Sequence, residues 1–423
     1  METLIRNIKE CRSDGMRFFA ARTGAKDVVS IEGSVLGGSY LLPYEKRPAH
    51  GLMASILDAG TKRRDKETLR NDLAERGIIL HFSSGADRTY FFASCLPEDI
   101  TYTLRLIAEC LESPLLAKSE FEAERARSLA MLSEAQTDTD AQASRAFARL
   151  VFDPVHVNYA DSIEEERSLT RGVSRADILT SQRMIGRGGL VLAVTGDLVP
   201  ERTLSEAERV FIKLPSGTEN LPAKPANQKE VTRGESLVHV PDKTNVDTYF
   251  GLSVPITHND SRYVPFAVLS SMLCGGGVFS SHLAQTIRER DGLTYAIAGG
   301  PYGFGEGAQG ALRVWANFAP DRFRYSVEAT LKEIRIFFKQ GVTIESLATM
   351  QSRMQGLYVT SLSNSRGIAA QLHKIGREGK QLTYVNEFPS LIRAVTLTDL
   401  QEAAALIPVD KFSLAAAGTF KKP

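Results

Sequence analysis

The sequence has little cysteine, and its cysteines show no pattern. Four are present in 423 residues, Cys11, Cys95, Cys110 and Cys274, and they are widely spread without any Cys-x-x-Cys spacing. This usage argues against a disulfide framework and against a thiolate metal site. A reducing compartment fits it best.

Targeting segments, membrane spans and an excess of one charge are missing as well. Acidic residues interrupt the N-terminal stretch where a signal peptide needs a continuous apolar core, and no run approaches membrane-spanning length. The formal net charge is +1 and the pI about 7.7, so no basic surface for nucleic acid or an anionic membrane is indicated. We therefore expect a cytoplasmic protein that binds neither nucleic acid nor a membrane.

Apolar residues make up 43% of the chain, and this length suggests two or more domains. Residues 214–230 are rich in proline and polar residues, which predicts a linker between an N-terminal domain, residues 1–213, and a C-terminal domain, residues 231–423. Helices are predicted over residues 49–59, 66–76, 98–112, 118–135, 140–152, 174–185, 264–273, 321–339, 344–362 and 398–407. Strands are predicted over residues 17–21, 28–35, 39–42, 78–82, 89–96, 190–195, 236–240, 248–254, 312–318 and 412–417.

The order of elements after the linker repeats the order before it. Val173-Ser174-x-x-Asp177-Ile178 resembles Val395-Thr396-x-x-Asp399-Leu400, and Gly196 and Gly418 each follow a strand, both pairs at an offset of 222. Ala74-Glu75-Arg76 similarly falls against Arg288-Glu289-Arg290 at an offset of 214. These matches predict a duplication into two halves, each with a sheet and helices.

A glycine-rich stretch matches a dinucleotide-binding pattern in form only. Gly305-x-Gly307-x-x-Gly310 is followed by residues 311–316, which alternate like a strand, whereas a phosphate site there needs a helix N-terminus. A long hairpin connection is the better prediction.

Residues 283–295 carry two strong hydrogen-bond donors. Phe279, Leu283 and Ile287 recur at four-residue steps, which predicts one apolar helix face, and Gly292 ends the helix before a strand. Arg288 then lies in the last helical turn and Tyr295 near the start of the strand. A guanidinium and a phenol hydroxyl can together stabilise an oxyanion or bind a peptide carbonyl. Taken alone, this stretch is explained equally simply by a solvated arginine and a half-buried tyrosine without a functional role.

A second stretch, residues 48–61, contains half of a metal motif. On a helix, His50 and residue 54 lie one turn apart with residue 53 beside them, which is the geometry of the inverted zinc motif His-x-x-Glu-His. Met53 takes up no proton near neutral pH, and Ala54 offers no lone pair to a metal. We interpret His50 as a structural histidine.

Together these features resemble the pitrilysin/insulinase family of zinc peptidases, the inverzincins, and especially their bacterial-type short subunits. The resemblance covers nearly the whole chain. It rests on His50 followed by Gly60-Thr61, Glu124-Arg125, Asp153-Pro154 with Tyr159, Val194-Thr195-Gly196-Asp197, Ser281-x-Leu283, Arg288-Glu289 and Gly292-Leu293-x-Tyr295. It implies an α+β fold of two homologous domains, each with a mostly antiparallel sheet packed against helices.

Carried over position by position, the resemblance implies a degenerate zinc site. The family's two histidine ligands fall on His50 and Ala54, its catalytic glutamate on Met53 and its third ligand on Met131. Glu134, one helical turn from Met131, would have only His50 to join. We therefore expect no metal or other cofactor on this chain.

Arg288 and Tyr295, by contrast, match the family's arginine and tyrosine and keep their seven-residue separation. The implied function is that of the Arg/Tyr-contributing subunit of a heterodimeric zinc peptidase, inactive alone, acting on peptides or small unfolded proteins. A paralogous partner would supply His-x-x-Glu-His and zinc, and the peptide would add to a sheet edge. The alternative is a wholly non-catalytic homologue that acts as a scaffold or binds peptides, whereas Met53 and Ala54 disfavour an active homodimer.

Overall fold

The computed structural model describes residues 7–275, 280–305 and 307–420. The chain forms two compact units, and each takes segments from both halves of the sequence. The first unit comprises the described residues up to Ala130 together with residues 167–222 and 358–388, and the second comprises residues 131–166, 223–357 and 389 onward. These units differ from the contiguous halves 1–213 and 231–423, because residues 131–166 and 358–388 are exchanged. The predicted boundaries refer to the sequence repeat and remain a prediction.

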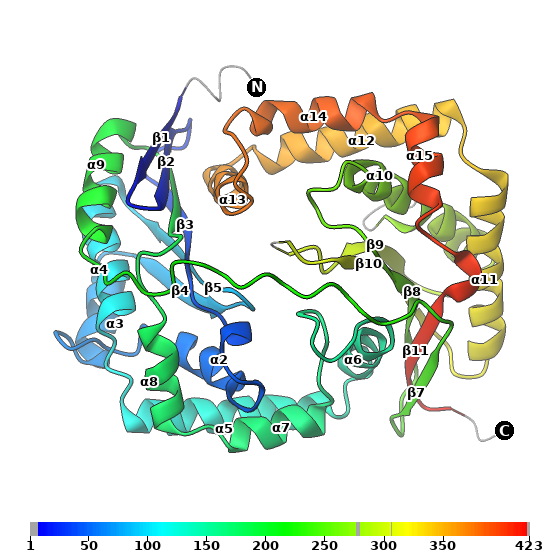
Figure 1. Ribbon diagram of the computed structural model, residues 1–423, viewed down its shortest axis with the longest axis horizontal. Helices are drawn as coiled ribbons and strands as arrows, with labels where there is room; N and C mark the ends of the chain where they lie inside the picture. The colour runs from blue at the N-terminus through cyan, green and yellow to red at the C-terminus, as the bar shows by residue number, and fades with distance from the viewer. Residues whose placement is uncertain (1–6, 276–279, 306, 421–423) are drawn as a thin grey trace. The chain divides into compact units, whose positions relative to one another are not determined.

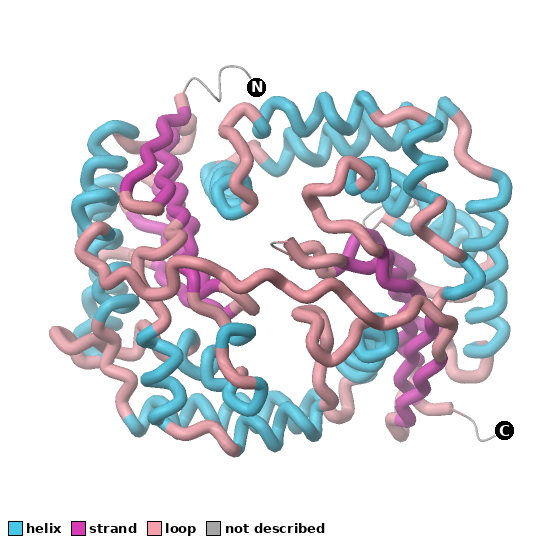
Figure 2. The backbone as a smooth tube through the Cα atoms, in the orientation of Figure 1, coloured by secondary structure: helices cyan, strands magenta, loops and turns pink. Residues whose placement is uncertain are grey.

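The first unit contains one sheet and the helices that cover it (Figures 1 and 2). Its strands are β1 (Ile8–Ser13), β2 (Met16–Arg22), β3 (Val29–Leu36), β4 (Ile79–Ser84), β5 (Arg88–Cys95) and β6 (Val191–Gly196). Its helices are α2 (Pro48–Ala54), α3 (Lys66–Glu75), α4 (Ile100–Glu112), α8 (Arg175–Arg183), α9 (Pro200–Phe211) and α13 (Ser365–Arg377), with short 3₁₀ turns η1 (Ser39–Leu41), η2 (Tyr44–Lys46) and η3 (Pro97–Asp99).

The second unit contains the other sheet. Its strands are β7 (Glu235–His239), β8 (Val246–Val254), β9 (Ile297–Tyr302), β10 (Gly310–Phe318) and β11 (Ser413–Gly418). Its helices are α6 (Thr139–Val151), α10 (Tyr263–Cys274), the π-helix η4 (Ala284–Arg290), α11 (Phe323–Gln340), α15 (Leu397–Ala404) and the 3₁₀ turn η5 (Val409–Lys411). Four helices contain the boundaries between the units: α5 (Lys118–Ala135), α7 (Ile163–Arg171), α12 (Ile344–Ser361) and α14 (Tyr384–Ala394).

The two sheets have the same topology, apart from one extra edge strand. Their orders are β1-β2-β6-β3-β5-β4 and β7-β11-β8-β10-β9. In each, one parallel pair, β2 with β6 or β7 with β11, adjoins antiparallel pairs. The predicted fold class, α+β with two homologous domains that each have a mostly antiparallel sheet packed against helices, is confirmed.

Helix caps repeat along with the sheets. Ser174 and Asp177 form a capping box at the start of α8, and Thr396 and Asp399 form the same box at the start of α15. Gly196 (φ 144°) and Gly418 (φ 158°) end the equivalent strands β6 and β11. The offset of 222 that the sequence showed is therefore an offset between equivalent structural positions.

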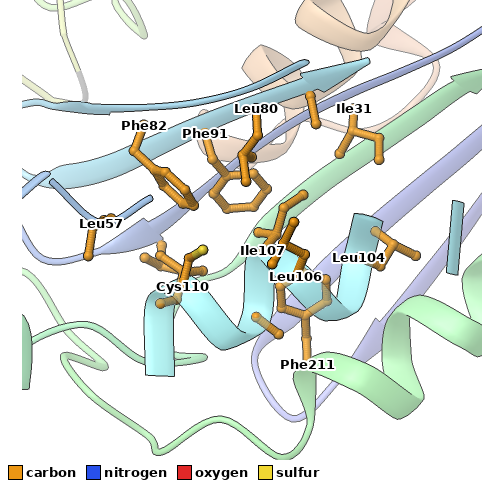
Figure 3. Packing of buried hydrophobic residues seen from close by; sticks show 14 of the residues in the cluster. Ile31, Leu57, Leu80, Phe82, Phe91, Leu104, Leu106, Ile107, Cys110 and Phe211 are labelled. Carbon is orange, nitrogen blue, oxygen red and sulfur yellow. The ribbon is translucent and has the colours of Figure 1, made fainter. Parts of the chain in front are cut away.

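The first sheet is packed on both faces in its centre, and the second sheet packs against α6. In the first unit, one face meets α4 and α9, where Phe82, Phe91 and Phe211 lie against the apolar side of α4 (Figure 3). The other face of β2, β6 and β3 meets α13. In the second unit α6 packs on β8 and β11. Apolar burial on both faces explains why β6 is buried along its whole length, and β8, in the centre of the second sheet, is buried along its whole length as well.

Some predicted elements differ from the observed ones. The helix that begins near residue 49 ends at Ala54 rather than residue 59, and residues 39–41 form a 3₁₀ turn instead of a strand. Helices α7, α9, α13 and α14 and strand β1 were not predicted. No helix in the described part of the chain is long and apolar enough to cross a membrane.

Candidate functional site

Arg288 lies on a π-helix rather than on the predicted α-helix. The N–H of Asp291 donates to the carbonyl of Thr286 at 3.0 Å, five residues back, and the N–H of Leu293 donates to the carbonyl of Ile287 at 2.9 Å. Leu283 and Ile287 are fully buried, as predicted, whereas Phe279 lies outside the described residues. Gly292 has φ 60°, which confirms it as the left-handed residue that ends the helix.

The structure brings Arg288 and Tyr295 together. The guanidinium carbon of Arg288 lies 5.5 Å from the centre of the Tyr295 ring, and Arg288 Nε lies 3.5 Å from Glu289 Oε1. Tyr295 is 82% exposed, two residues before β9 begins. An exposed tyrosine beside a guanidinium presents two kinds of hydrogen-bond donor to the same surface.

Thr294 anchors the backbone next to Tyr295. Its hydroxyl donates to the carbonyl of Asn317 at 2.6 Å, at the end of β10, and lies 2.9 Å from Asn317 Oδ1. The backbone N–H of Ala296 donates to the same hydroxyl at 3.2 Å. Thr294 is buried, so this contact fixes the position from which Tyr295 projects.

Glu333 of α11 contacts the segment that carries Arg288. Its carboxylate accepts from His282 Nε2 at 3.1 Å and from Arg290 Nη2 at 3.0 Å. Arg290 also donates through Nε and Nη2 to the two oxygens of Asp291, at 2.7 and 2.8 Å, and these bonds lower the pKa of Asp291. Sequence analysis found none of Thr294, Asn317, Glu333 or His282.

His50 is enclosed by hydroxyl groups. Its Nδ1 lies 2.9 Å from Ser181 Oγ, on α8, and its Nε2 lies 3.2 Å from Thr89 Oγ1, on β5. The side chain is fully buried, and burial lowers the pKa of His50 to about 4. Both ring nitrogens therefore have protein partners, and His50 links three elements of the first unit.

The residues around His50 do not fit zinc. Met53 and Ala54 are buried in the core, and neither carries a group that a zinc ion binds in peptidase sites of this kind. Met131 is 57% exposed on α5. In residues 7–275, 280–305 and 307–420, no group of three or more His, Cys, Asp and Glu side chains could hold a metal ion.

Strand β4 forms one edge of the first sheet and pairs, among the described strands, with β5 alone. Ile79 is 60% exposed on this strand, and β4 contains no proline. Among the described strands its outer edge is unpaired, as the addition of a further strand requires.

The glycine-rich stretch after Gly299 is a hairpin, as predicted. β9 and β10 pair in antiparallel register from Ala311 with Tyr302 to Ala316 with Ile297. Asn158 Nδ2 donates to the carbonyls of Gly303 and Gln309, at 2.8 and 3.1 Å. This stretch therefore has a structural role.

Comparisons with known proteins agree with the fold. Residues 48–155 match the family model described as insulinase (peptidase family M16), and residues 182–354 match the model described as the peptidase M16 inactive domain. An uncharacterized zinc protease of Streptomyces coelicolor is 22% identical, over 86% of this chain and 79% of that protein. The non-peptidase homolog YmxG of Helicobacter pylori is 23% identical, over 62% of this chain and 59% of that protein. The crystal structure of a peptidase M16 inactive domain from Pseudomonas fluorescens superposes with a TM-score of 0.86 at 18% identity, covering 99% of this chain and 100% of that one.

Proposed function

Because the chain belongs to the insulinase family, peptidase family M16, we propose that it is the non-zinc-binding subunit of a heterodimeric peptidase. In this proposal the chain contributes Arg288 and Tyr295 to an active site whose zinc and glutamate base belong to a paralogous subunit. The substrate is a peptide or a small unfolded protein. The chain alone has no peptidase activity.

The observation that carries the proposal is the contact between Arg288 and Tyr295. Their side chains lie together at 5.5 Å, with Tyr295 82% exposed. Next to Tyr295, Thr294 is bonded to Asn317, and next to Arg288, the side chain of Arg290 is bonded to Glu333. Donors that are already oriented when negative charge develops on a carbonyl oxygen stabilise the transition state without reorganisation. The arrangement suits an oxyanion or a peptide carbonyl that another chain presents.

The degenerate metal site supports the need for a partner. His50 is bound by Ser181 and Thr89, and positions 53 and 54 carry no metal ligand. A peptidase of this family with only this chain would lack both its metal and its base. An exposed edge such as β4 would receive an extended peptide by backbone pairing, with side chains on alternate faces contacting the sheet.

The test is to combine the purified chain with a family member from the same genome that keeps His-x-x-Glu-His. The mixture is assayed with a library of quenched fluorescent peptides, with and without a chelator. We expect chelator-sensitive cleavage by the mixture and none by this chain. Arg288→Ala and Tyr295→Phe should each lower kcat/KM by about two to three orders of magnitude while the two chains stay associated.

Two exposed residues of α11 serve as matched controls. Tyr325 is 64% exposed, and Arg335 forms an ion pair with Asp410 at 3.3 Å. Tyr325→Phe and Arg335→Ala should leave the rate unchanged. If the partner subunit has full peptidase activity with Arg288→Ala and also with Tyr295→Phe, the catalytic role of these two residues is refuted.

A second candidate function is that of a wholly non-catalytic scaffold or peptide-binding protein. The match of residues 182–354 to an inactive domain and the similarity to a non-peptidase homolog favour it. A scaffold has no chemical need for an oriented arginine and tyrosine. Unchanged turnover in Arg288→Ala and Tyr295→Phe would therefore favour this candidate, as would a lack of peptidase activity with every partner that keeps His-x-x-Glu-His.

A further inference from the structure

We propose that Glu333 is a positioning residue, which fixes the π-helical segment that carries Arg288 in the conformation the peptidase needs. This inference rests on the proposed function of Arg288 and Tyr295. Glu333 itself touches no substrate in this proposal. It acts through His282 and Arg290.

The first argument is the geometry of the contact. Glu333 Oε2 accepts from His282, which precedes η4, and Glu333 Oε1 accepts from Arg290, which is the last residue of η4. One carboxylate therefore binds both ends of the segment. Arg288 lies between these two attachment points.

The second argument is burial. Glu333 is 6% exposed and lies on α11, a helix of 18 residues, so it provides a fixed point. The His282 ring also packs 5.3 Å from the ring of Phe337, one turn further along α11. A buried carboxylate is strongly disfavoured unless donors surround it, so Glu333 requires the segment to stay where His282 and Arg290 can reach it.

The third argument comes from the helix type. A π-helix is rare and occurs mostly as a single irregular turn, often at functional sites. An α-helical turn contains fewer residues than a π-helical turn. If η4 became α-helical, a shift of one residue would rotate the side chains that follow by about 100° around the helix axis. Arg288 would then leave the ring of Tyr295, while the buried Leu283 kept its place. The attachment of both ends to Glu333 opposes this change.

The test uses Glu333→Gln, which keeps the side-chain shape and removes its charge, with Glu328→Gln as the matched control. Glu328 lies on the same helix and is exposed. In the chain alone, Glu333→Gln should speed amide hydrogen exchange in residues 284–293 by about tenfold or more, which corresponds to opening that is easier by about 1.4 kcal/mol. Glu328→Gln should leave exchange there unchanged. Arg290→Gln removes the other side of the contact at a half-exposed residue and should have the same effect as Glu333→Gln.

In the assembled pair, Glu333→Gln should lower kcat by roughly 10- to 100-fold and leave KM near the wild-type value, because misplacement of a donor costs rate rather than binding. Its effect should be smaller in an Arg288→Lys background, since a flexible lysine depends less on the helix. The positioning role would be overturned if hydrogen exchange in residues 284–293 were unchanged in both Glu333→Gln and Arg290→Gln. It would also be overturned if Glu333→Gln lowered kcat equally with Arg288 and with Arg288→Lys. Full activity of Arg288→Ala would instead refute the proposed function, and the exchange result would still decide whether Glu333 holds the segment.

Discussion

Ser34 Oγ and His373 Nε2 lie 2.8 Å apart in a buried hydrogen bond that joins residues 339 positions apart in the chain. Ser34 belongs to β3 and His373 to α13, so the bond attaches a helix from the C-terminal half of the sequence to the N-terminal sheet. Thr195 adds a second attachment, because its hydroxyl donates to the carbonyl of Ser365 at 2.6 Å. The first unit is therefore complete only when residues 358–388 are present.

This dependence predicts that α13 contributes strongly to stability. Leu372 is 1% exposed in the cluster between α13 and the sheet, so Leu372→Ala should lower the free energy of unfolding by about 2–5 kcal/mol. Lys374→Ala, at an exposed position of the same helix, is the control. Urea unfolding followed by circular dichroism measures both. Equal stability of the two variants would show that the helix packs loosely.

Buried histidines predict a loss of stability in acid. Burial holds the pKa of His50 at about 4, and burial together with Arg377 and Arg88 holds that of His373 well below 6.5. In the unfolded chain both histidines take up a proton near pH 6.5, so below that pH the unfolded state binds more protons. Stability should be full above about pH 6.5 and fall as the pH approaches 4, with His50 contributing on the order of 3 kcal/mol.

The measurement is urea unfolding at several pH values between 7 and about 4. His50→Gln should reduce the slope of stability against pH in this window, whereas His239→Gln alters an exposed histidine of β7 and serves as control. A slope that His50→Gln leaves unaltered would contradict the assignment of this window to His50.

Restoring the motif should not restore zinc binding. In a Met53→Glu, Ala54→His variant, His50 would still be bonded to Ser181 and Thr89, and position 131 would still lack a carboxylate. We expect less than stoichiometric zinc by elemental analysis after dialysis. One zinc per chain would mean that the His50 ring turns away from its hydroxyl partners at little cost.

Thr294 should prove necessary for the position of Tyr295. Thr294→Val removes the hydroxyl that binds Asn317 and leaves partly buried polar groups without this partner. The free energy of unfolding should fall by about 1 kcal/mol. Hydrogen exchange at Ala296 should become faster. Thr294→Ser keeps the hydroxyl and should behave like the wild type, so similar exchange in the valine and serine variants would argue against the anchor.

The sequence by itself determined the local features of this protein. Gly77 (φ 61°) and Gly292 (φ 60°) end helices where glycine predicts it, and the two capping boxes lie at equivalent positions. The loss of ligands at Met53 and Ala54 is likewise visible in the sequence. Helix ends, caps and ligand types depend on a few neighbouring residues, so their physical causes can be read without the fold.

Only the tertiary structure decided which helix covers which sheet. Two glycines weaken the helical signal of α13, and the structure shows the reason for both. A Cβ on Gly376 would lie 2.3 Å from Val191 Cγ1, and a Cβ on Gly367 would collide with the carbonyl oxygen of Ser361. The same limit applies to the candidate site. The partners of His50, which are Ser181 and Thr89, come from distant parts of the chain, and so does Glu333, which contacts the segment that carries Arg288. Contacts between residues so far apart leave no periodicity in a sequence, because burial and hydrogen bonding across elements arise only when the chain folds.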